Sequence, residues 1–239
     1  MTKDFFVGVS GFSYPGWKGR FYPKDLKSEE FLAYYSQHLQ SVEINSSFYA
    51  SPSAATVKSW CERTGERFRF SFKAPRQVTH ILKLGKGSVE AAGRFSKVLD
   101  LGPRRGPILF QLPPYSKLDL ELLGGFLSET SDIRDRVFEF RHQSWFQEPT
   151  YQLLERNGAG FCIAETEDLK PTFRVTGGFA YFRLRMEAYT AKAIDKWAEK
   201  IGETSKGLRE SYVYLRHDET GENAVLAQRL SERLKSTKG

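Results

Sequence analysis

Short apolar or alternating runs recur along this chain, and segments with helical spacing separate most of them. The runs typical of β-strands cover residues 5–10, 41–45, 67–73, 106–112, 136–140, 160–164, 179–185 and 211–216. The segments with helical spacing cover residues 28–39, 53–64, 88–99, 119–130, 149–157, 190–201 and 223–234. Strands that alternate with helices form parallel sheets. Eight such strands in 239 residues favour an α/β fold, a single closed (β/α)8 barrel of the TIM type, over an open doubly wound sheet.

One unit of this barrel is predicted to be irregular. Residues 165–178 contain Pro171 and paired glycines and show no helical period, so we expect an irregular crossing in place of a regular helix after the sixth strand. No internal repeat or linker interrupts the chain, which predicts one domain over residues 1–239. Only the last residues, 235–239, are expected to fray.

Composition narrows the class of protein. The chain carries 36 Lys and Arg against 29 Asp and Glu, and the resulting net charge of +7 favours anionic partners. No apolar run is long enough to span a membrane, and no signal peptide is recognisable. Cys61 and Cys162 are too few for a disulfide framework or a thiolate zinc site. We therefore expect a cytoplasmic protein with no membrane partner.

The polar residues of the predicted strands alternate with apolar ones and gather near the strand ends. Successive side chains of a strand point to opposite faces, and the helices cover the more apolar face, so this polar set is predicted to face the barrel interior. The set comprises Ser10, Glu43, Asn45, Ser71, Lys73, Gln111, Glu139, Arg141, Arg183, Arg185, Tyr214 and Arg216. Barrel enzymes build their active sites at the carboxyl ends of the strands.

Two interpretations of the inward charges stay open. A charge inside a barrel is costly unless it is paired, so the charges can form an internal network that only stabilises the fold. In that network Glu139 pairs with Arg141 or Lys73, and Glu43 pairs with Arg183. Alternatively the charges line a ligand pocket, and their excess of cations over carboxylates suits a phosphate or carboxylate group.

Aromatic and histidine residues in the predicted loops complete the candidate site. The stretch GFSYPGWKG, residues 11–19, has the glycine spacing of a phosphate-binding loop, but Trp17 stands where the lysine should be. We expect Trp17 and Trp145 to line the pocket and to stack on a base or sugar, with packing of Trp17 on a neighbouring helix as the alternative. His80 is a candidate for phosphate binding, proton transfer or metal ligation, or else an ordinary loop histidine, and His142 is a candidate for proton transfer.

The histidines and carboxylates show no spacing typical of a metal site. The four histidines have neither an HExxH pattern nor paired spacing, so no required metal and no cofactor is predicted. A loosely held divalent ion at Glu43, Glu139 and His142 is the alternative.

Six motifs, in order along the chain, resemble one known family. VGVSGFSYPGWKGRFYP, VEINSSFY, FRFSFKAPRQVTH, ILFQLPP, FEFRHQSW and AYFRLR are similar to motifs of the YecE-like family, a bacterial and archaeal domain of unknown function. The resemblance covers about residues 5–230 and implies a TIM-type barrel, with no established reaction. The family's recurring positions fall here on Glu43, Asn45, Tyr49, Lys73, Thr79, His80, Gln111, Pro113, Glu139, Arg141, His142, Trp145 and Arg183.

Two departures from the family pattern add basic residues. After the seventh strand the family usually reads Arg-Leu-His-Gly, whereas residues 183–186 of this chain have Arg185 in place of the histidine. After the eighth strand, Arg216 and His217 replace paired asparagines. The changes imply a more anionic ligand or a changed activity, and they exclude metal ligation or proton transfer by the replaced histidine.

The sequence thus favours an enzyme of hydrolase or isomerase type that binds a phosphorylated or otherwise anionic substrate, either a nucleic acid or a sugar phosphate. Lys73, Arg141 and Arg183 are expected to hold the anion and to stabilise charge in the transition state. Glu43 or Glu139 is the predicted general base, with His80 or His142 as the acid. Further substrate contacts are predicted at Asn45, Tyr49, Gln111, Arg185, Arg216, Trp17 and Trp145. The alternatives are a non-catalytic nucleic-acid-binding protein and a metal-assisted, sugar-handling barrel.

Overall fold

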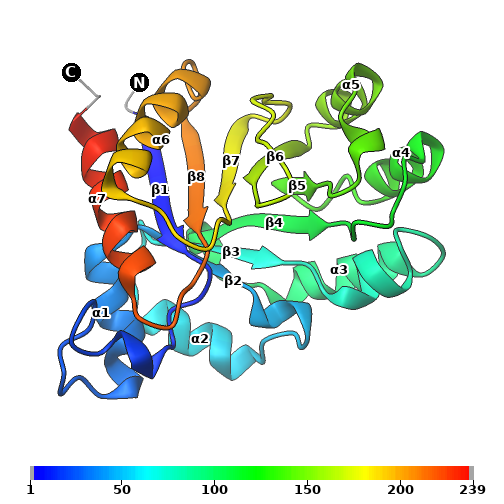
Figure 1. Ribbon diagram of the computed structural model, residues 1–239. Helices are drawn as coiled ribbons and strands as arrows, with labels where there is room; N and C mark the ends of the chain where they lie inside the picture. Colours follow the sequence, from blue (N-terminus) through cyan, green and yellow to red (C-terminus); the bar gives the residue numbers. More distant parts are fainter. Residues whose placement is uncertain (1–2, 237–239) are drawn as a thin grey trace.

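In the computed structural model, which describes residues 3–236, the eight predicted strands form one parallel sheet that curls into a nearly closed barrel (Figure 1). The strands are β1 (Asp4–Val9), β2 (Ser41–Ile44), β3 (Arg69–Lys73), β4 (Arg105–Gln111), β5 (Arg136–Glu139), β6 (Gly160–Glu165), β7 (Phe179–Leu184) and β8 (Glu210–Leu215). They pair in the order β1-β8-β7-β6-β5-β4-β3-β2. The predicted barrel is confirmed.

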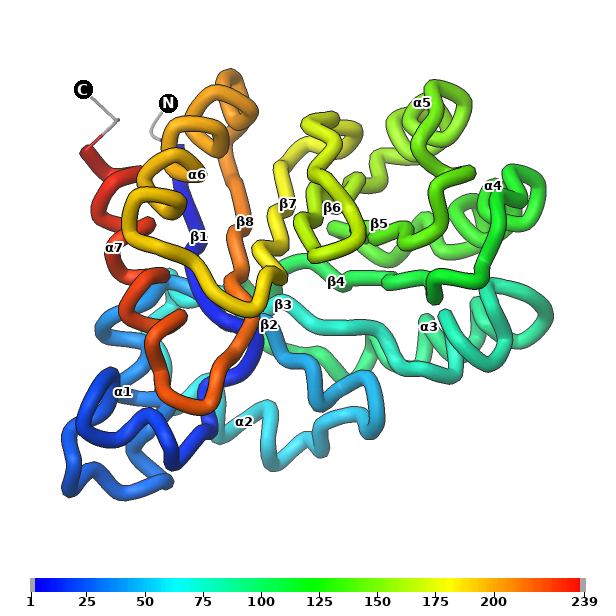
Figure 2. The backbone as a smooth tube through the Cα atoms, viewed as in Figure 1, coloured from blue at the N-terminus to red at the C-terminus, as the bar shows by residue number. Residues whose placement is uncertain are grey.

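Helices lie on the outside of the barrel (Figures 1 and 2). They are α1 (Phe31–His38), α2 (Ala54–Glu62), α3 (Ser88–Val98), α4 (Leu120–Glu129), α5 (Glu148–Arg156), α6 (Ala191–Thr204) and α7 (Glu222–Ser236). Short helical turns are η1 (Pro15–Trp17), η2 (Ser28–Glu30), η3 (Ser46–Phe48), η4 (Gln77–Ile81), η5 (Gly102–Arg104) and η6 (Gln143–Trp145). Among residues 3–236, no helix is both long and apolar enough to cross a bilayer.

The two predicted irregularities have different outcomes. The chain runs from the end of β6 at Glu165 to the start of β7 at Phe179 without a helix, so the predicted irregular crossing is confirmed. Of the tail that is predicted to fray, Lys235 and Ser236 instead belong to α7, and residues 237–239 lie outside the described residues. The last helix packs against the first strand, as the red and blue segments of Figure 2 show.

Because each strand has two faces, the core has two layers. The outer faces of the strands pack on the helices in one large apolar cluster. A second buried cluster fills the barrel interior and comprises Phe6, Leu109, Val137, Cys162, Ala164, Phe179, Tyr181, Tyr212 and Tyr214. On β5 and β7 the next inward residues are charged, Glu139 after Val137 and Arg183 after Tyr181, and on β4 the next is the polar Gln111. The apolar interior therefore supports a polar layer at the carboxyl ends.

The barrel closes between β1 and β2, where strand pairing consists of a single bridge between Ser10 and Glu43 among the described residues. Tyr35 of α1 links the two strands, because its hydroxyl accepts a hydrogen bond from a β1 amide and donates one to the Ser41 carbonyl, both at 2.9 Å. A Cβ atom at Gly8 would lie 1.8 Å from that carbonyl oxygen. The missing side chain of Gly8 is what lets the two strands approach.

We expect Gly8→Ala to lower the free energy of unfolding by about 2 to 4 kcal/mol, because β1 must move away from β2 to admit the methyl group. Urea unfolding measures the change. Gly125→Ala is the matched control, since an added Cβ there, in α4, meets no atom within 4 Å. That substitution should raise stability by up to about 1 kcal/mol. Equal effects of the two substitutions would contradict the role of Gly8 in closure.

Candidate active site

A buried ion-pair network occupies the barrel interior at the carboxyl ends of the strands. Arg183 of β7 lies between two carboxylates: its Nη2 donates to Oε1 of Glu43 at 2.8 Å, and its Nη1 donates to Oε2 of Glu139. Arg141 donates through Nε to Oε1 of Glu139 at 2.5 Å. The predicted pairings of Glu43 with Arg183 and of Glu139 with Arg141 are therefore confirmed.

Neutral donors complete the hydrogen bonding of both carboxylates. Glu43 accepts from the Ser10 hydroxyl and from the Tyr181 hydroxyl, each at 2.8 Å. Glu139 accepts from the Gln111 side-chain amide, also at 2.8 Å. Both carboxylates are 0% exposed. Buried charges are tolerated when they are paired and hydrogen-bonded in this way.

The electrostatics and burial of Glu43, Glu139 and Arg183 argue against the catalytic and anion-binding roles predicted for these three residues. Burial is the largest single influence and raises the pKa of the Glu43 and Glu139 carboxyls, but the Arg183 guanidinium, the other nearby arginines and the hydrogen-bond donors together outweigh it and hold the pKa of each below its ordinary value. Carboxylates that stay ionised and inaccessible are poor general bases at neutral pH. Arg183 is itself only 1% exposed, with both terminal nitrogens bonded to carboxylates, so it is not placed to hold a substrate.

Positive charge exceeds negative charge in this layer. Four cations, against the two carboxylates, face inward: Lys73, Arg141, Arg183 and Arg185. Arg185 donates to the Ser10 hydroxyl at 2.7 Å and forms no ion pair in the described part of the chain. Burial and the neighbouring Arg183 lower the pKa of Arg185 to about 10, so it stays protonated at neutral pH. No carboxylate of residues 3–236 forms an ion pair with it, and the Ser10 hydroxyl stands between it and Glu43.

Lys73 and His80 meet at the ring of Phe48. The Nζ atom of Lys73, the last residue of β3, lies 4.0 Å from the ring centre, and the His80 ring packs edge-on at 4.8 Å between centres. The Ser47 hydroxyl lies 2.7 Å from the carbonyl oxygens at the ends of both β2 and β3, which positions the turn that carries Phe48.

Burial and the Arg183 guanidinium lower the pKa of Lys73 to about 8. Burial and the Lys73 cation lower the pKa of His80, which keeps its imidazole neutral at neutral pH.

Four other predicted residues lie near strand ends but outside the network. Asn45 has a buried Oδ1 atom with no hydrogen-bond partner in residues 3–236. The Nδ1 atom of His142 contacts the Ser144 hydroxyl at 2.8 Å. Tyr49 is 78% exposed, and Arg216 is also exposed. Within the described residues, no side-chain hydrogen bond joins any of the four to the network.

The predicted stacking role of the two tryptophans is wrong. Trp17 is 0% exposed and Trp145 is 2% exposed, so neither presents a free ring face. Trp17 packs among neighbouring aromatic rings and donates through Nε1 to the Asp218 carbonyl at 2.7 Å. Trp145 stacks on Phe140 at 4.4 Å and donates to the Ser116 carbonyl at 2.8 Å. Both indoles belong to the core, because burying such a large ring stabilises the fold.

Two residues that contact the site are missing from the prediction. Tyr181, which donates to Glu43, shares the inward face of β7 with Arg183, so strict alternation along that strand could have identified it. Phe48, which contacts Lys73, lies in the turn η3, where no alternation pattern exists.

The proposed metal alternative lacks its ligands. Arg183 lies between Glu43 and Glu139 and donates to both, so these carboxylates do not form a ligand set with His142. Across residues 3–236, no group of three or more His, Cys, Asp or Glu side chains is arranged to hold a metal ion.

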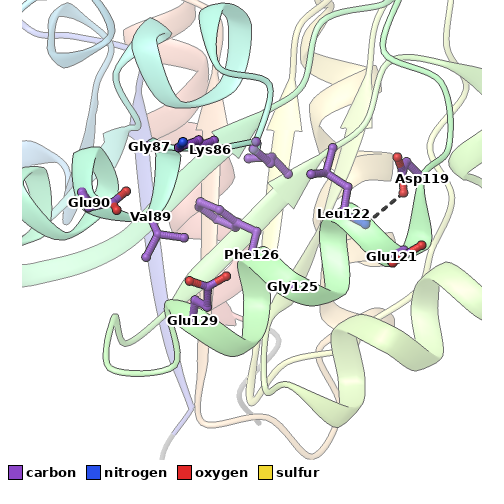
Figure 3. A pocket seen from close by; sticks show the side chains of 12 residues that line it. Lys86, Gly87, Val89, Glu90, Asp119, Glu121, Leu122, Gly125, Phe126 and Glu129 are labelled. Carbon is purple, nitrogen blue, oxygen red and sulfur yellow. Dashed lines mark hydrogen bonds between the residues drawn. The ribbon is translucent and has the colours of Figure 1, made fainter.

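A cavity of about 620 Å³ lies away from this layer, between α3 and α4 (Figure 3). Four carboxylates and one lysine contribute to its lining: Glu90, Asp119, Glu121, Glu129 and Lys86. Asp119 is engaged in capping α4, because its Oδ1 accepts from the Leu122 amide at 2.9 Å. The cavity contains none of the predicted site residues, and its acidic lining does not suit an anion.

We expect Glu139→Gln to lower the free energy of unfolding at pH 7 by about 3 to 5 kcal/mol, because Arg183 and Arg141 lose their buried counter-charge. The pKa of Glu139 is lower in the folded protein than in the unfolded chain, so its contribution is fully present above the unfolded value, near 4.5. The contribution is lost as the pH falls below that value towards the folded pKa.

The difference in unfolding free energy between the parent and Glu139→Gln should therefore shrink between pH 5 and the lowest pH at which urea unfolding remains reversible. Glu121→Gln, which alters an exposed carboxylate of α4, should change stability by less than about 0.5 kcal/mol at every pH. A difference for Glu139→Gln that stays constant with pH would contradict the lowered pKa.

Two curated bacterial proteins are similar in sequence to part of this chain. UPF0759 protein YunF of Bacillus subtilis (strain 168) is 30% identical over 156 residues, which are 62% of this chain and 54% of YunF. UPF0759 protein YecE of Escherichia coli (strain K12) is 29% identical over 142 residues, 59% of this chain and 50% of YecE. The matched regions span about half the length of these curated relatives.

Solved structures extend the likeness to the whole barrel. A DUF72 family protein from Thermotoga maritima superposes with a TM-score of 0.82 at 28% identity, covering 97% of this chain and 99% of that one. A DUF72 family protein from Enterococcus faecalis has a TM-score of 0.76 at 18% identity, covering 98% of each chain, and it shows the fold alone. The model of the family described as "Protein of unknown function DUF72" matches residues 6–239, so the chain belongs to the DUF72 family.

Proposed function

We propose that this protein is an enzyme, of hydrolase or isomerase type, that acts on a small phosphorylated or otherwise anionic substrate at the carboxyl ends of the barrel strands. The observation that carries the proposal is Arg185, a partly buried cation with no carboxylate partner in the described chain. An unpaired cation in a low-dielectric site is costly, and a bound anion would offset that cost.

Arg141 offers a second group for the same anion. Its side chain is 29% exposed, and it contacts Glu139 only through Nε and forms no hydrogen bond through its terminal nitrogens within residues 3–236. Arg141 and Arg185 also interact electrostatically, because both face this layer. Two guanidinium groups that share one anion are a common arrangement for phosphate or carboxylate binding.

His80 is the residue best suited to proton transfer. Its lowered pKa leaves the imidazole neutral at neutral pH, and a neutral imidazole can accept a proton from a substrate. Glu43 and Glu139 have a different role in this proposal: they hold Arg183 in place beneath the anion. Hydrolysis and isomerisation of an anionic substrate both need a proton-transfer group beside an anion site, so this arrangement serves either reaction.

The first test is a thermal-shift titration with inorganic phosphate, sugar phosphates and nucleotides. A ligand that binds only the folded state raises the melting temperature, and saturation at about 100 times its Kd corresponds to about 2.7 kcal/mol. We expect Arg185→Gln to weaken binding by about tenfold or more, through loss of a charge-assisted hydrogen bond. A compound that shifts the parent is then assayed for hydrolysis and isomerisation.

Arg156→Gln is the matched control, because Arg156 is exposed at the end of α5. This variant should bind each ligand as the parent does. Equal binding by the parent and by Arg185→Gln, or no shift with any anion, would contradict the anion site.

A second candidate function is non-catalytic nucleic-acid binding. It is favoured by a surface cavity of about 260 Å³ whose lining includes Tyr49, Arg76 and Arg94, where an exposed aromatic ring lies beside two cations. Such surfaces stack bases and contact phosphates.

If this second candidate is right, Tyr49→Ala should weaken the binding of single-stranded nucleic acid by about 1 to 3 kcal/mol. Binding should also fall steeply with salt, because phosphate contacts release counterions. Filter binding over a salt series measures both effects. An unchanged affinity of Tyr49→Ala, or turnover of a small anion with no salt-dependent binding, would contradict this function.

A cytoplasmic location is part of the proposal. It is supported by both cysteines, Cys61 and Cys162, which are free rather than paired in a disulfide.

A further inference from the structure

The amine of Lys73 has an uncommon setting for a lysine in a charged layer. Two carboxylates lie in the same layer, but both are bonded to arginines. The Nζ atom of Lys73 forms neither a hydrogen bond nor an ion pair within residues 3–236, and its close contact is the Phe48 ring at 4.0 Å. The amine is thus held in place by an aromatic surface and not neutralised by a carboxylate.

The groups that act on Lys73 come from several strands and from one loop. The charged groups that face it are Arg183, Arg185, Glu43 and Glu139 in the barrel, and the titratable His80 faces it from η4. Burial and Arg183 outweigh the carboxylates and lower the pKa of Lys73 to about 8. The lowered pKa leaves a far larger share of the amine uncharged near neutral pH than an ordinary lysine has.

An uncharged lysine amine beside other cations is an activated nucleophile towards carbonyl groups. Lys73 lies at the carboxyl end of a barrel strand, where enzymes of this fold carry out their chemistry. The unpaired Arg185 lies in the same charged layer and supplies a place for an anionic group on the same molecule.

We propose that Lys73 forms an imine with an aldehyde or ketone substrate that also carries a phosphate or carboxylate group. This inference rests on the proposed function, because the anionic group of the substrate binds at Arg185 and Arg141. It adds the chemical class of the substrate and a covalent role for Lys73.

The reaction balances without a further reactant. The lone pair of Lys73 Nζ forms a bond to the carbonyl carbon, and one amine proton moves to the oxygen to give a carbinolamine. The carbon–oxygen bond then breaks, the second amine proton leaves with the hydroxyl group as water, and the carbon–nitrogen double bond forms. His80, whose ring packs on the same Phe48, is the neighbouring group that relays these protons.

Labelling with pyridoxal 5′-phosphate tests the inference, because this probe carries both an aldehyde and a phosphate. The full chain is incubated with the probe from pH 6 to pH 10, the imine is reduced with borohydride, and the labelled lysines are located by peptide mass spectrometry. We expect Lys73 to react about tenfold or more faster than the other lysines at pH 7. The rate of its labelling should follow a pKa of about 8.

Two lysine variants serve as controls. Lys73→Arg keeps a cation but removes the nucleophile, and it should lose the fast label. Lys83→Arg is the matched control, because Lys83 is exposed and its Nζ also lies over an aromatic ring, that of Tyr115, at 5.3 Å. It should leave the labelling of Lys73 unchanged. The pH profile is measured on the parent protein, so the test does not depend on either variant folding.

A parallel reaction with pyridoxal, which lacks the phosphate, separates the two proposals. Pyridoxal labels every amine more slowly, because its free hydroxymethyl group closes onto its own aldehyde, so each rate is taken relative to that of Lys83 with the same probe. On that scale we expect pyridoxal to label Lys73 about tenfold more slowly than pyridoxal 5′-phosphate does, and Arg185→Gln to abolish that preference. Equal, fast labelling by both probes would support the imine while contradicting the anion site. Phosphate binding together with labelling of Lys73 no faster than that of Lys83 would overturn the imine and leave the anion site standing.

Discussion

The bridge that Arg183 makes between Glu43 and Glu139 is the interaction on which the rest of this site depends. It spans the barrel interior from β7 to β2 on one side and to β5 on the other. Two buried carboxylates without it would repel each other and would lose the partner that compensates for their desolvation. The bridge therefore allows a small barrel to keep a charged layer above an apolar interior.

The same bridge sets the electrostatics of the groups around it. Arg183 and Arg141 neutralise the carboxylates, so little negative charge is left for Lys73 and Arg185. These two cations instead respond to burial and to the positive charge of Arg183, which lowers the pKa of each. The layer thus contains an ion-paired part, formed by Glu43, Glu139, Arg183 and Arg141, and two cations, Lys73 and Arg185, that form no ion pair among the described residues. The proposed anion binding and the proposed imine formation both use these two cations, and the ion-paired carboxylates hold Arg183 in place beside them.

The sequence predicted the barrel well because the pattern that specifies it is local. Apolar alternation and helical spacing each depend on residues a few positions apart, and the irregular crossing before β7 followed from the same local signals. Alternation also identified which polar residues face inward, and it correctly placed Glu43, Glu139 and Arg183 in one layer. It could not show whether each of those residues is accessible.

The failures in the site have one physical cause. Trp17 and Trp145 follow strands in loops, as stacking residues of barrel enzymes do, yet the folded loops turn both indoles into the core. Phe48 contacts Lys73 from the turn that Ser47 bonds to the ends of β2 and β3. Such contacts join residues that are distant in the chain, so no local pattern records them.

The sequence by itself determined the barrel, the inward face of each strand and the excess of cations over carboxylates in that inward set. The tertiary structure alone decided which cations are paired and which are not. A single sequence lists charges without distances, and the energy of a buried charge depends on its nearest partners and on its exposure to water. Only the fold could therefore show that Arg183 is ion-paired, whereas Arg185 and Lys73 form no ion pair among the described residues.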